Sequence, residues 1–190
     1  MLAARADLAD RVGKIAQKRG FTLFSMVNDL LELAIKVDGM GVTLKDTVDA
    51  YTLAREVKDA SFTLILESLL YDTTEIAFEK FREKTQKIWF DAGVWIAQRY
   101  LARGVADPLE TYERELKMFG WNIPSASLEH SGRQVSVRIL SPRFSEAYTE
   151  LFNQYLMGFL EGSGYKVTFN EVGRGNIRLE AAKRGVNDNR

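Results

Sequence analysis

Basic side chains gather near the start of the chain, where they could contact phosphate groups. Four of them lie close together: Arg11, Lys14, Lys18 and Arg19. Cations on one helix face can line the backbone of a nucleic acid. Asp7 and Asp10 lie just before them, so an ordinary solvated helix face explains the same residues. Residues 1–60 contain nine basic and nine acidic side chains. We therefore expect that counterion release contributes little to the binding of a nucleic acid by this region.

Aromatic side chains are frequent in two later segments and could wall a cavity for an apolar ligand. They are Phe78, Phe81, Trp89, Phe90, Trp95 and Tyr100, followed by Phe152, Tyr155 and Phe159. The same spacing fits an aromatic core or a dimer seam. Trp89 and Trp95 are six residues apart, on different faces of a helix. We expect at least one of them to face something other than the main core, such as a partner chain.

Residues suited to catalysis are scarce. The 190 residues include no cysteine and one histidine, which excludes thiolate chemistry and multi-histidine metal sites. His130 directly precedes a Ser-Gly turn, where a lone histidine is usually a surface residue. The Gly-Arg-Gly run at residues 173–175 joins two predicted strands, unlike a phosphate loop. We therefore predict no catalytic residue, no metal site and no cofactor, and we expect that the protein is not an enzyme.

The charge balance and the apolar runs narrow the class of protein further. Lys and Arg together number 26, as do Asp and Glu, so the chain is no strongly basic nucleic-acid coat. The first twenty residues are too charged for a signal peptide. The longest apolar stretch, residues 62–71, is interrupted by Glu67 and is shorter than the about 20 residues of a membrane span. We expect a cytoplasmic protein that contacts no membrane.

Two helices are predicted first. Apolar residues recur at three- and four-residue steps over residues 8–16, and Gly20 is placed to end that helix. Thr22 is a suitable N-cap for the next helix, whose apolar stripe covers residues 26–35. The glycines within residues 39–41 end this second helix.

Further helices are predicted up to residue 103. Thr43 and Asp46 have the spacing of a capping box. The helix that they open is expected to bury Val48, Tyr51, Ala54 and Val57. Residues 62–71 fit either a buried strand or a helix, and we favour a helix. A long helix over residues 73–103 follows.

The period of the pattern changes in the last third of the chain. Asp107-Pro108 starts a helix that Gly120 ends. Alternating apolar residues then predict one hairpin over residues 125–140 and a second over residues 167–181. Between them lies a helix opened by Ser141-Pro142, whose two glycines, Gly158 and Gly162, favour close packing against the sheet or a second chain.

These elements predict an α+β fold. A helical N-terminal region precedes a small domain of two β-hairpins, which form a four-stranded antiparallel sheet with helices on one face. We assign residues 1–60 to a helical region for dimerisation and possible DNA binding. Residues 61–185 form a sensor-like α+β domain, and residues 186–190 a frayed tail.

The first helix pair resembles the ribbon-helix-helix family of DNA-binding domains. The resemblance is carried by Leu8, Val12, Ile15-Ala16, Gly20-Phe21-Thr22, Met26-Val27 and Leu30-Leu31. It implies a dimer that pairs one short strand from each chain, here residues 1–5, in the major groove of DNA, with a phosphate held at the start of the second helix. Leu23 and Phe24 stand where the family commonly has Arg and Ser.

Residues 108–183 are similar to the 4-vinyl-reductase-type domain, a small module related to haem-NO-type sensor folds. The resemblance rests on element order and on Tyr155-Leu156-Met157-Gly158-Phe159-Leu160, followed by Val167-Thr168-Phe169-Asn170-Glu171. It implies a sensor of small hydrophobic ligands, often joined to DNA-binding partners in archaeal and bacterial regulators. The family's frequent cysteines are missing here, so a metal- or thiol-dependent role does not carry over. The family name also suggests an enzyme acting on a hydrophobic substrate, which stays an alternative.

Together the two resemblances imply a homodimeric transcriptional regulator that senses a small apolar ligand. The predicted phosphate contacts are Arg5, Arg11, Thr22 and Ser25. The predicted ligand pocket consists of Trp95, Tyr155 and Phe159. The alternative is a ligand-binding or scaffold protein of the second fold that does not bind DNA.

Overall fold

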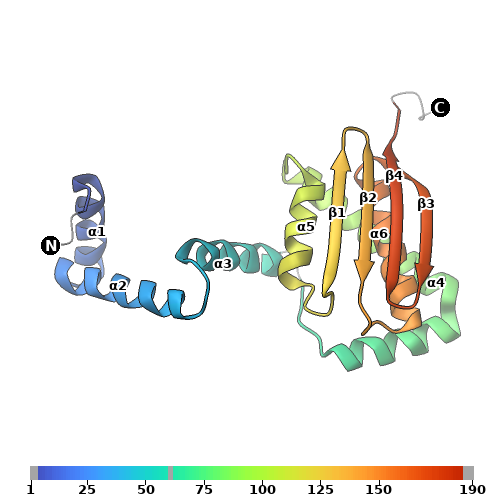
Figure 1. Cartoon of the computed structure of the whole chain (residues 1–190), viewed down its shortest axis with the longest axis horizontal. Helices are drawn as coiled ribbons and strands as arrows, with labels where there is room; N and C mark the ends of the chain where they lie inside the picture. Colours follow the sequence, from blue (N-terminus) through green and yellow to red (C-terminus); the bar gives the residue numbers. More distant parts are fainter. Residues whose placement is uncertain (1–3, 60–61, 186–190) are drawn as a thin grey trace. The chain divides into compact units, whose positions relative to one another are not determined.

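The computed structural model describes residues 4–59 and 62–185, and it confirms the α+β fold class (Figure 1). The chain divides into two compact units, Met1–Thr63 and Leu64–Arg190. The first unit contains three helices, α1 (Ala6–Lys18), α2 (Leu23–Gly39) and α3 (Leu44–Asp59). The second contains helices α4 (Glu67–Ala102), α5 (Pro108–Phe119) and α6 (Glu146–Gly162), and strands β1 (Ser125–Ser131), β2 (Gln134–Leu140), β3 (Tyr165–Gly173) and β4 (Asn176–Lys183).

The turn between α1 and α2 follows the predicted pattern. Gly20 adopts a φ of 76°, which a side chain would disfavour. The Phe21 N–H donates to the Ala16 carbonyl at 2.9 Å, and the Gly20 N–H donates to the Gln17 carbonyl at 3.2 Å. This is the Schellman arrangement that closes a helix end. Thr22 then caps α2, as predicted.

The start of α3 is also confirmed, but its buried face was wrongly predicted. The Thr43 N–H donates to an Asp46 carboxylate oxygen at 2.9 Å, and the Asp46 N–H donates to the Thr43 hydroxyl at 3.1 Å. This reciprocal pair is a capping box with Asp in place of Glu. Of the four residues expected to be buried, Val57 is half-buried, while Val48, Tyr51 and Ala54 are exposed. Leu53 is buried instead, so the inner face of α3 is rotated from the predicted one.

Helix α4 is kinked, and it joins the second half of the helix favoured over residues 62–71 to the long helix predicted over residues 73–103. Residues 62–66 have no regular structure, and the helix starts at Glu67, whose negative charge suits the positive helix N-terminus. The backbone leaves helical geometry at Phe81, with φ −141° and ψ 46°. The Thr85 hydroxyl reaches the Ala77 and Phe81 carbonyls at 3.2 and 2.9 Å, which satisfies acceptors that the kink frees.

Both predicted hairpins are confirmed and form one antiparallel sheet of order β1-β2-β4-β3. Ala126 pairs with Ile139 across the first hairpin, and Val172 pairs with Ile177 across the second. One face of the sheet is buried under the helices, and in Figure 1 α6 lies behind it. The residues of β1, β2 and β4 on that face are Leu128, Val135, Val137, Ile139, Ile177, Leu179 and Ala181.

Helices α5 and α6 of the second unit begin at side-chain caps. An Asp107 carboxylate oxygen accepts from the Leu109 and Glu110 N–H groups, as the Asp-Pro start predicts. Helix α6 begins at Glu146 rather than at the predicted Ser-Pro pair, because Ser145 supplies its cap by accepting from the Tyr148 N–H at 3.1 Å. Ser141 is fully buried and donates to the Asn122 carbonyl instead.

Three glycines allow α4 and α6 to approach at backbone distance. A Cβ at Gly158 would lie 2.0 Å from the Phe90 carbonyl oxygen, and a Cβ at Gly93 would lie 2.0 Å from the Tyr155 carbonyl oxygen. At Gly162 the added carbon would meet the Ala97 side chain at 2.8 Å. The close packing predicted for the α6 glycines is therefore present. The neighbour is α4, not the sheet or a second chain as expected.

Candidate functional site

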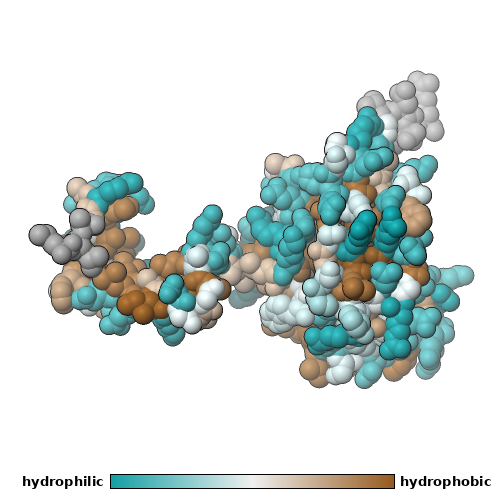
Figure 2. All heavy atoms as spheres, viewed as in Figure 1, coloured by the Kyte–Doolittle hydropathy of each residue, from teal (hydrophilic) through white to brown (hydrophobic). Residues whose placement is uncertain are grey.

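A large part of the apolar surface of the first unit is not covered within the chain. The buried apolar side chains of this unit, among the residues described, are Ala16, Met26, Val37 and Leu53. Larger ones on the three helices and in the turns between them stay exposed: Leu8, Ile15, Phe21, Leu23, Phe24, Val27, Leu30, Leu31, Leu33, Ile35, Met40, Val42, Leu44, Val48 and Tyr51. We call this surface the N-terminal apolar face, and Figure 2 shows hydrophobic residues over this part of the chain. Exposed apolar area of this extent marks a surface that another molecule covers.

The apolar face includes most of the stripe that the sequence predicts. On α2, Val27 and Leu31 lie one turn apart and are each 38% exposed, while Met26 beside them is buried. Leu8 and Ile15 of α1 are also exposed. Three short helices cannot enclose two apolar stripes by themselves, because a unit of this size buries little of its surface.

The N-terminus of α2 brings together two of the predicted phosphate contacts. The Thr22 side-chain oxygen accepts from the Ser25 N–H at 3.1 Å. The N–H groups of Leu23 and Phe24 lie in the first turn, where a helix offers them no partner of its own. Both residues are exposed. The turn thus presents N–H groups and the positive end of the helix dipole, a geometry suited to an anion.

The other two predicted contacts, Arg5 and Arg11, belong to the α1 region. Arg5 precedes α1, and its guanidinium donates two hydrogen bonds to Asp7, at 3.0 and 2.6 Å. These hydrogen bonds hold the pKa of the Asp7 carboxyl below its usual range. Arg11 is exposed on α1. Arg5 therefore already has an anionic partner within the chain, whereas the structure gives Arg11 none within the described residues.

The charge of the first unit is unevenly distributed along the sequence. Residues 4–22 contain five basic and two acidic side chains, a net charge of +3. Residues 23–59 contain four basic and seven acidic side chains, a net charge of −3. The balance over the whole unit conceals this separation, and the positive part includes α1 and the start of α2. The predicted ribbon, residues 1–5, lies outside the described residues except for Ala4 and Arg5.

The structure brings two of the three predicted pocket residues together. Phe159 is fully buried, with its ring centroid 4.3 Å from that of Tyr112. Tyr155 is stacked on Phe152 at 5.9 Å. Trp95 is 53% exposed on the outer side of α4 and does not belong to this cluster. The sequence suggested that one tryptophan faces away from the core, and Trp95 does so.

Two tyrosine hydroxyls of the second unit, those of Tyr71 and Tyr100, form side-chain hydrogen bonds that the sequence did not predict. The Tyr71 hydroxyl donates to Glu67 at 2.8 Å and accepts from the Asn122 side-chain amide at 3.1 Å. The Tyr100 hydroxyl donates to Glu115. Burial raises the pKa of both tyrosines above the usual 10. The hydroxyls therefore stay protonated at neutral pH and act as structural donors rather than as acids or bases.

One buried polar atom of α6 has no hydrogen-bond partner. Asn153 is 1% exposed, and its side-chain oxygen is unpaired. Its amide nitrogen lies 3.7 Å from the Met157 sulfur, a weak contact. An unpaired amide oxygen in an apolar interior is costly. It is the polar feature nearest in sequence to the predicted pocket residue Tyr155.

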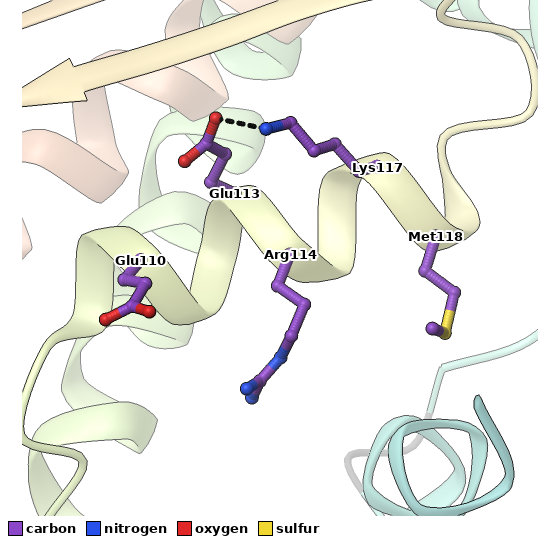
Figure 3. A pocket seen from close by; sticks show the side chains of 5 residues that line it. All are labelled: Glu110, Glu113, Arg114, Lys117 and Met118. Carbon is purple, nitrogen blue, oxygen red and sulfur yellow. Dashed lines mark ion pairs between the residues drawn. The ribbon is translucent and has the colours of Figure 1, made fainter. Parts of the chain in front are cut away.

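An open hollow lies along the surface of α5 (Figure 3). It is lined by Glu110, Glu113, Arg114, Lys117 and Met118. Glu113 and Lys117 form an ion pair at 2.6 Å. All five residues come from one helix, and none of them is one of the predicted pocket residues.

Other kinds of site were also considered. His130 is exposed at the end of β1, 3.5 Å from an Asp107 carboxylate oxygen. In the described residues, no three His, Cys, Asp or Glu side chains are grouped to hold a metal ion. None of the helices in the described part of the chain has the length and apolar character needed to cross a membrane. Comparison with known protein families, with curated proteins and with solved structures finds no match for this chain.

Proposed function

We propose that the protein is a homodimeric, DNA-binding transcriptional regulator. In this proposal the N-terminal apolar face joins two copies, and the α2 N-termini hold DNA phosphates. The observation that supports it is the exposure of the apolar stripes of α1 and α2 in a unit that buries few apolar side chains. Covering such a surface contributes about 25 cal/mol for each Å² of apolar area removed from water.

A second copy is the occupant that this face fits best. Two-fold pairing places each apolar stripe against an identical one, so a single surface satisfies both partners. Val27 and Leu31 lie at the helical spacing by which two α2 helices would interlock. Pairing would also place two α2 N-termini on one assembly, as recognition of two DNA half-sites requires.

Phosphate binding is proposed at the first turn of α2, assisted by α1. Thr22 keeps its hydroxyl proton available for a phosphate oxygen, because its oxygen accepts from Ser25. Arg11 adds an exposed cation in the part of the unit with net charge +3. Arg5 would contact a phosphate only after its ion pair with Asp7 breaks.

The second unit is proposed to sense a small apolar ligand through its aromatic interior. Phe159 and Tyr155 are packed against other aromatic rings, so a ligand there must displace side chains. It would act by favouring one of two dimer states over the other. Trp95 would join such a site only through a rearrangement of α4.

A second candidate is a ligand-binding or scaffold protein that does not bind DNA. Two observations favour it. Arg5 is already paired with Asp7. Leu23 and Phe24 provide no side-chain donor in the first turn of α2. This candidate shares the dimer but not the DNA contact.

The dimer is tested by measuring the mass of the full chain against concentration by sedimentation. Leu31→Glu places a charge in the N-terminal apolar face, and we expect it to weaken dimerisation at least about tenfold. Gln17→Glu makes the same change of charge at an exposed polar position of α1 and should leave the mass unchanged. Equal dimerisation of Leu31→Glu and Gln17→Glu would contradict the assignment of this face.

A further inference from the structure

The helices of the second unit pack on one face of its sheet and leave the other face open (Figure 1). On β2 and β4 the side chains of this open face alternate with the buried ones, so they belong to the even-numbered residues. They are Gln134, Ser136, Arg138 and Leu140 on β2, and Asn176, Arg178, Glu180 and Ala182 on β4. The open face is therefore mostly polar and suits polar rather than apolar contacts.

Two arginines lie directly opposite each other on the open face. Arg138 of β2 is paired with Arg178 of β4 in the register of the sheet, and these are its two inner strands. Residues in this relation have Cβ atoms about 5 Å apart. Like charges so placed repel each other, and the pair therefore destabilises the sheet unless an anion is bound to both.

The two arginines differ in how the chain holds them. The Arg178 guanidinium donates to Glu180 at 2.9 Å and lies 5.2 Å from the centre of the Phe169 ring, and these two contacts fix its position. Its Nε is buried without a hydrogen-bond partner among the described residues. Arg138 is exposed, and in the described part of the chain its guanidinium has no ion pair or hydrogen bond. One arginine is thus fixed, and the other is free to close on a ligand.

The neighbours of the pair on one side are uncharged hydrogen-bond donors. Ser127 lies opposite Arg138 on β1. Asn176 lies two residues before Arg178 on the same face of β4, and it is opposite Leu140. A serine hydroxyl and an asparagine amide can each donate to an oxygen of a bound anion. Two guanidinium groups, a hydroxyl and an amide are therefore neighbours on one part of the open face.

Carboxylates lie on the other side of the pair and limit what it can bind. Glu129 and Glu180 are both opposite Ser136 of β2. Glu171 is opposite Arg178 on β3. A nucleic-acid backbone carries further phosphates on each side of the one that is bound, and these would be repelled by the three carboxylates. A single phosphate group avoids this repulsion.

We propose that Arg138 and Arg178 bind a single phosphate group, free or carried by a small molecule, on the open face of the sheet. Ser127 and Asn176 donate to its remaining oxygens. The planar donor fork of arginine matches phosphate oxygens. A phosphate group offers at least three acceptor oxygens for these side chains, whereas a carboxylate offers two. The site lies within the second unit, so it depends neither on the proposed N-terminal dimer nor on the proposed DNA contact.

Phosphate binding is tested by thermal unfolding of the full-length chain, followed by tryptophan fluorescence. All three tryptophans belong to the second unit. We expect inorganic phosphate at about ten times its Kd to raise Tm by about 4 °C over sodium chloride of the same ionic strength. Arg138→Gln should lose most of this rise. Phosphate salts also stabilise proteins in general, so the difference between the two chains measures binding.

Arg174→Gln is the matched control, because it removes an exposed arginine from the turn between β3 and β4 of the same unit. It should keep the full rise. Without phosphate, Arg138→Gln should unfold at the same temperature as the original chain or above it, since it relieves the repulsion within the pair. An equal rise in the two variants overturns the proposal. So does a phosphate-free Tm of Arg138→Gln that is lowered by as much as phosphate raises it in the original chain, because Arg138 then stabilises the sheet without an anion.

Further probes identify the source of the phosphate group. A larger Arg138-dependent rise with glycerol phosphate than with inorganic phosphate supports a phosphate carried by a small molecule, and an equal or smaller rise supports free phosphate. Acetate at the same ionic strength should give no rise that depends on Arg138. A rise with acetate equal to that with phosphate contradicts a phosphate site.

DNA binding separates this site from the proposed function. A DNA duplex should bind equally well to the original chain and to Arg138→Gln. Weaker binding by the variant places a nucleic-acid backbone on the sheet and contradicts a site for a single phosphate. A chain that binds no DNA but shows the Arg138-dependent rise refutes the DNA contact and supports the phosphate site.

Discussion

At the scale of single residues, short polar side chains decide where the helices begin. Thr22, Asp107 and Ser145 each accept hydrogen bonds from N–H groups that the first turn leaves unpaired. Asp46 differs because it is paired reciprocally with Thr43. The Thr43 hydroxyl also donates to an Asp46 carboxylate oxygen at 2.6 Å. This hydrogen bond, together with that from the Thr43 N–H, holds the pKa of the Asp46 carboxyl below the usual 3.8.

A pH dependence of α3 follows from this lowered pKa. A carboxyl with a depressed pKa stabilises the folded helix above its unfolded pKa, and the contribution is lost as the pH falls through the folded value. We expect the backbone amide signals of Thr43 and Asp46 to titrate together in NMR spectra, with a midpoint below 3.8. Asp46→Asn keeps the geometry without the charge and should abolish the transition. A midpoint above 3.8 in the original chain would contradict the capping role.

Features that depend on one or two neighbouring residues were the easiest to predict from the sequence. Gly20 and Thr22 predicted the α1–α2 turn, because a left-handed backbone and a cap each need one residue type. The start of α6 was missed by a few residues, because Ser141-Pro142 has a similar pattern to the true cap at Ser145. The hydrogen bond between Tyr71 and Asn122 could not be foreseen, since the two residues are far apart in sequence.

At the scale of elements, the close contact of α4 and α6 organises the second unit. Gly158 and Gly93 each lie where a Cβ would be 2.0 Å from a carbonyl oxygen of the facing helix. The sequence placed two glycines within a helix and indicated close packing. It did not identify α4 as the partner, because helix pairing depends on the path of the chain between them.

Substituting a glycine at this contact should separate the helices. We expect Gly158→Ala to lower the free energy of unfolding of the second unit by at least about 2 kcal/mol, because neither backbone can give way. Gly13→Ala is the matched control: Gly13 is a helical glycine of α1 with nothing within 4 Å of its added Cβ. It should be neutral or stabilising, by up to about 1 kcal/mol. Urea unfolding followed by tryptophan fluorescence reports the second unit, and far-ultraviolet circular dichroism reports the helices of both units. A Gly158→Ala variant with the same fluorescence midpoint as the original chain would contradict the packing account.

The spacing of apolar residues predicted some elements correctly and failed for others. Alternation predicted both hairpins, because a sheet with one buried face imposes a period of two. In residues 62–66 a continuous apolar run had no period to distinguish strand from helix, and neither forms. In α3 the expected stripe was rotated, since a helix with few buried residues has little to fix its inner face.

At the scale of the whole molecule, the two units differ in how far they cover their own apolar residues. The second unit encloses a continuous core of aromatic and aliphatic side chains. The first leaves most of its apolar stripes exposed. The exposed stripes of α1 and α2 are the surface that we propose a second copy covers.

Only part of the candidate site could be predicted from the sequence. Thr22 and Ser25 were foreseen as neighbours because they share one helical turn. The ion pair between Arg5 and Asp7 was not predicted, although only Ala6 separates the two residues in the sequence. Trp95 was assigned to a pocket, whereas it is exposed on α4. Burial depends on the assembled fold, and spacing alone does not determine it.

The most direct test of the proposed function is the salt dependence of DNA binding by the full-length chain, measured by fluorescence anisotropy with duplexes from its own upstream region. We expect binding at about 50 mM salt that weakens as salt rises. Arg11→Ala should lower the slope of log K against log salt by about 2, since a dimer loses one phosphate contact from each chain. Arg55→Ala, in the acidic part of the first unit, should leave the slope unchanged. No binding at about 50 mM salt, or equal slopes for both variants, would contradict DNA recognition by this protein.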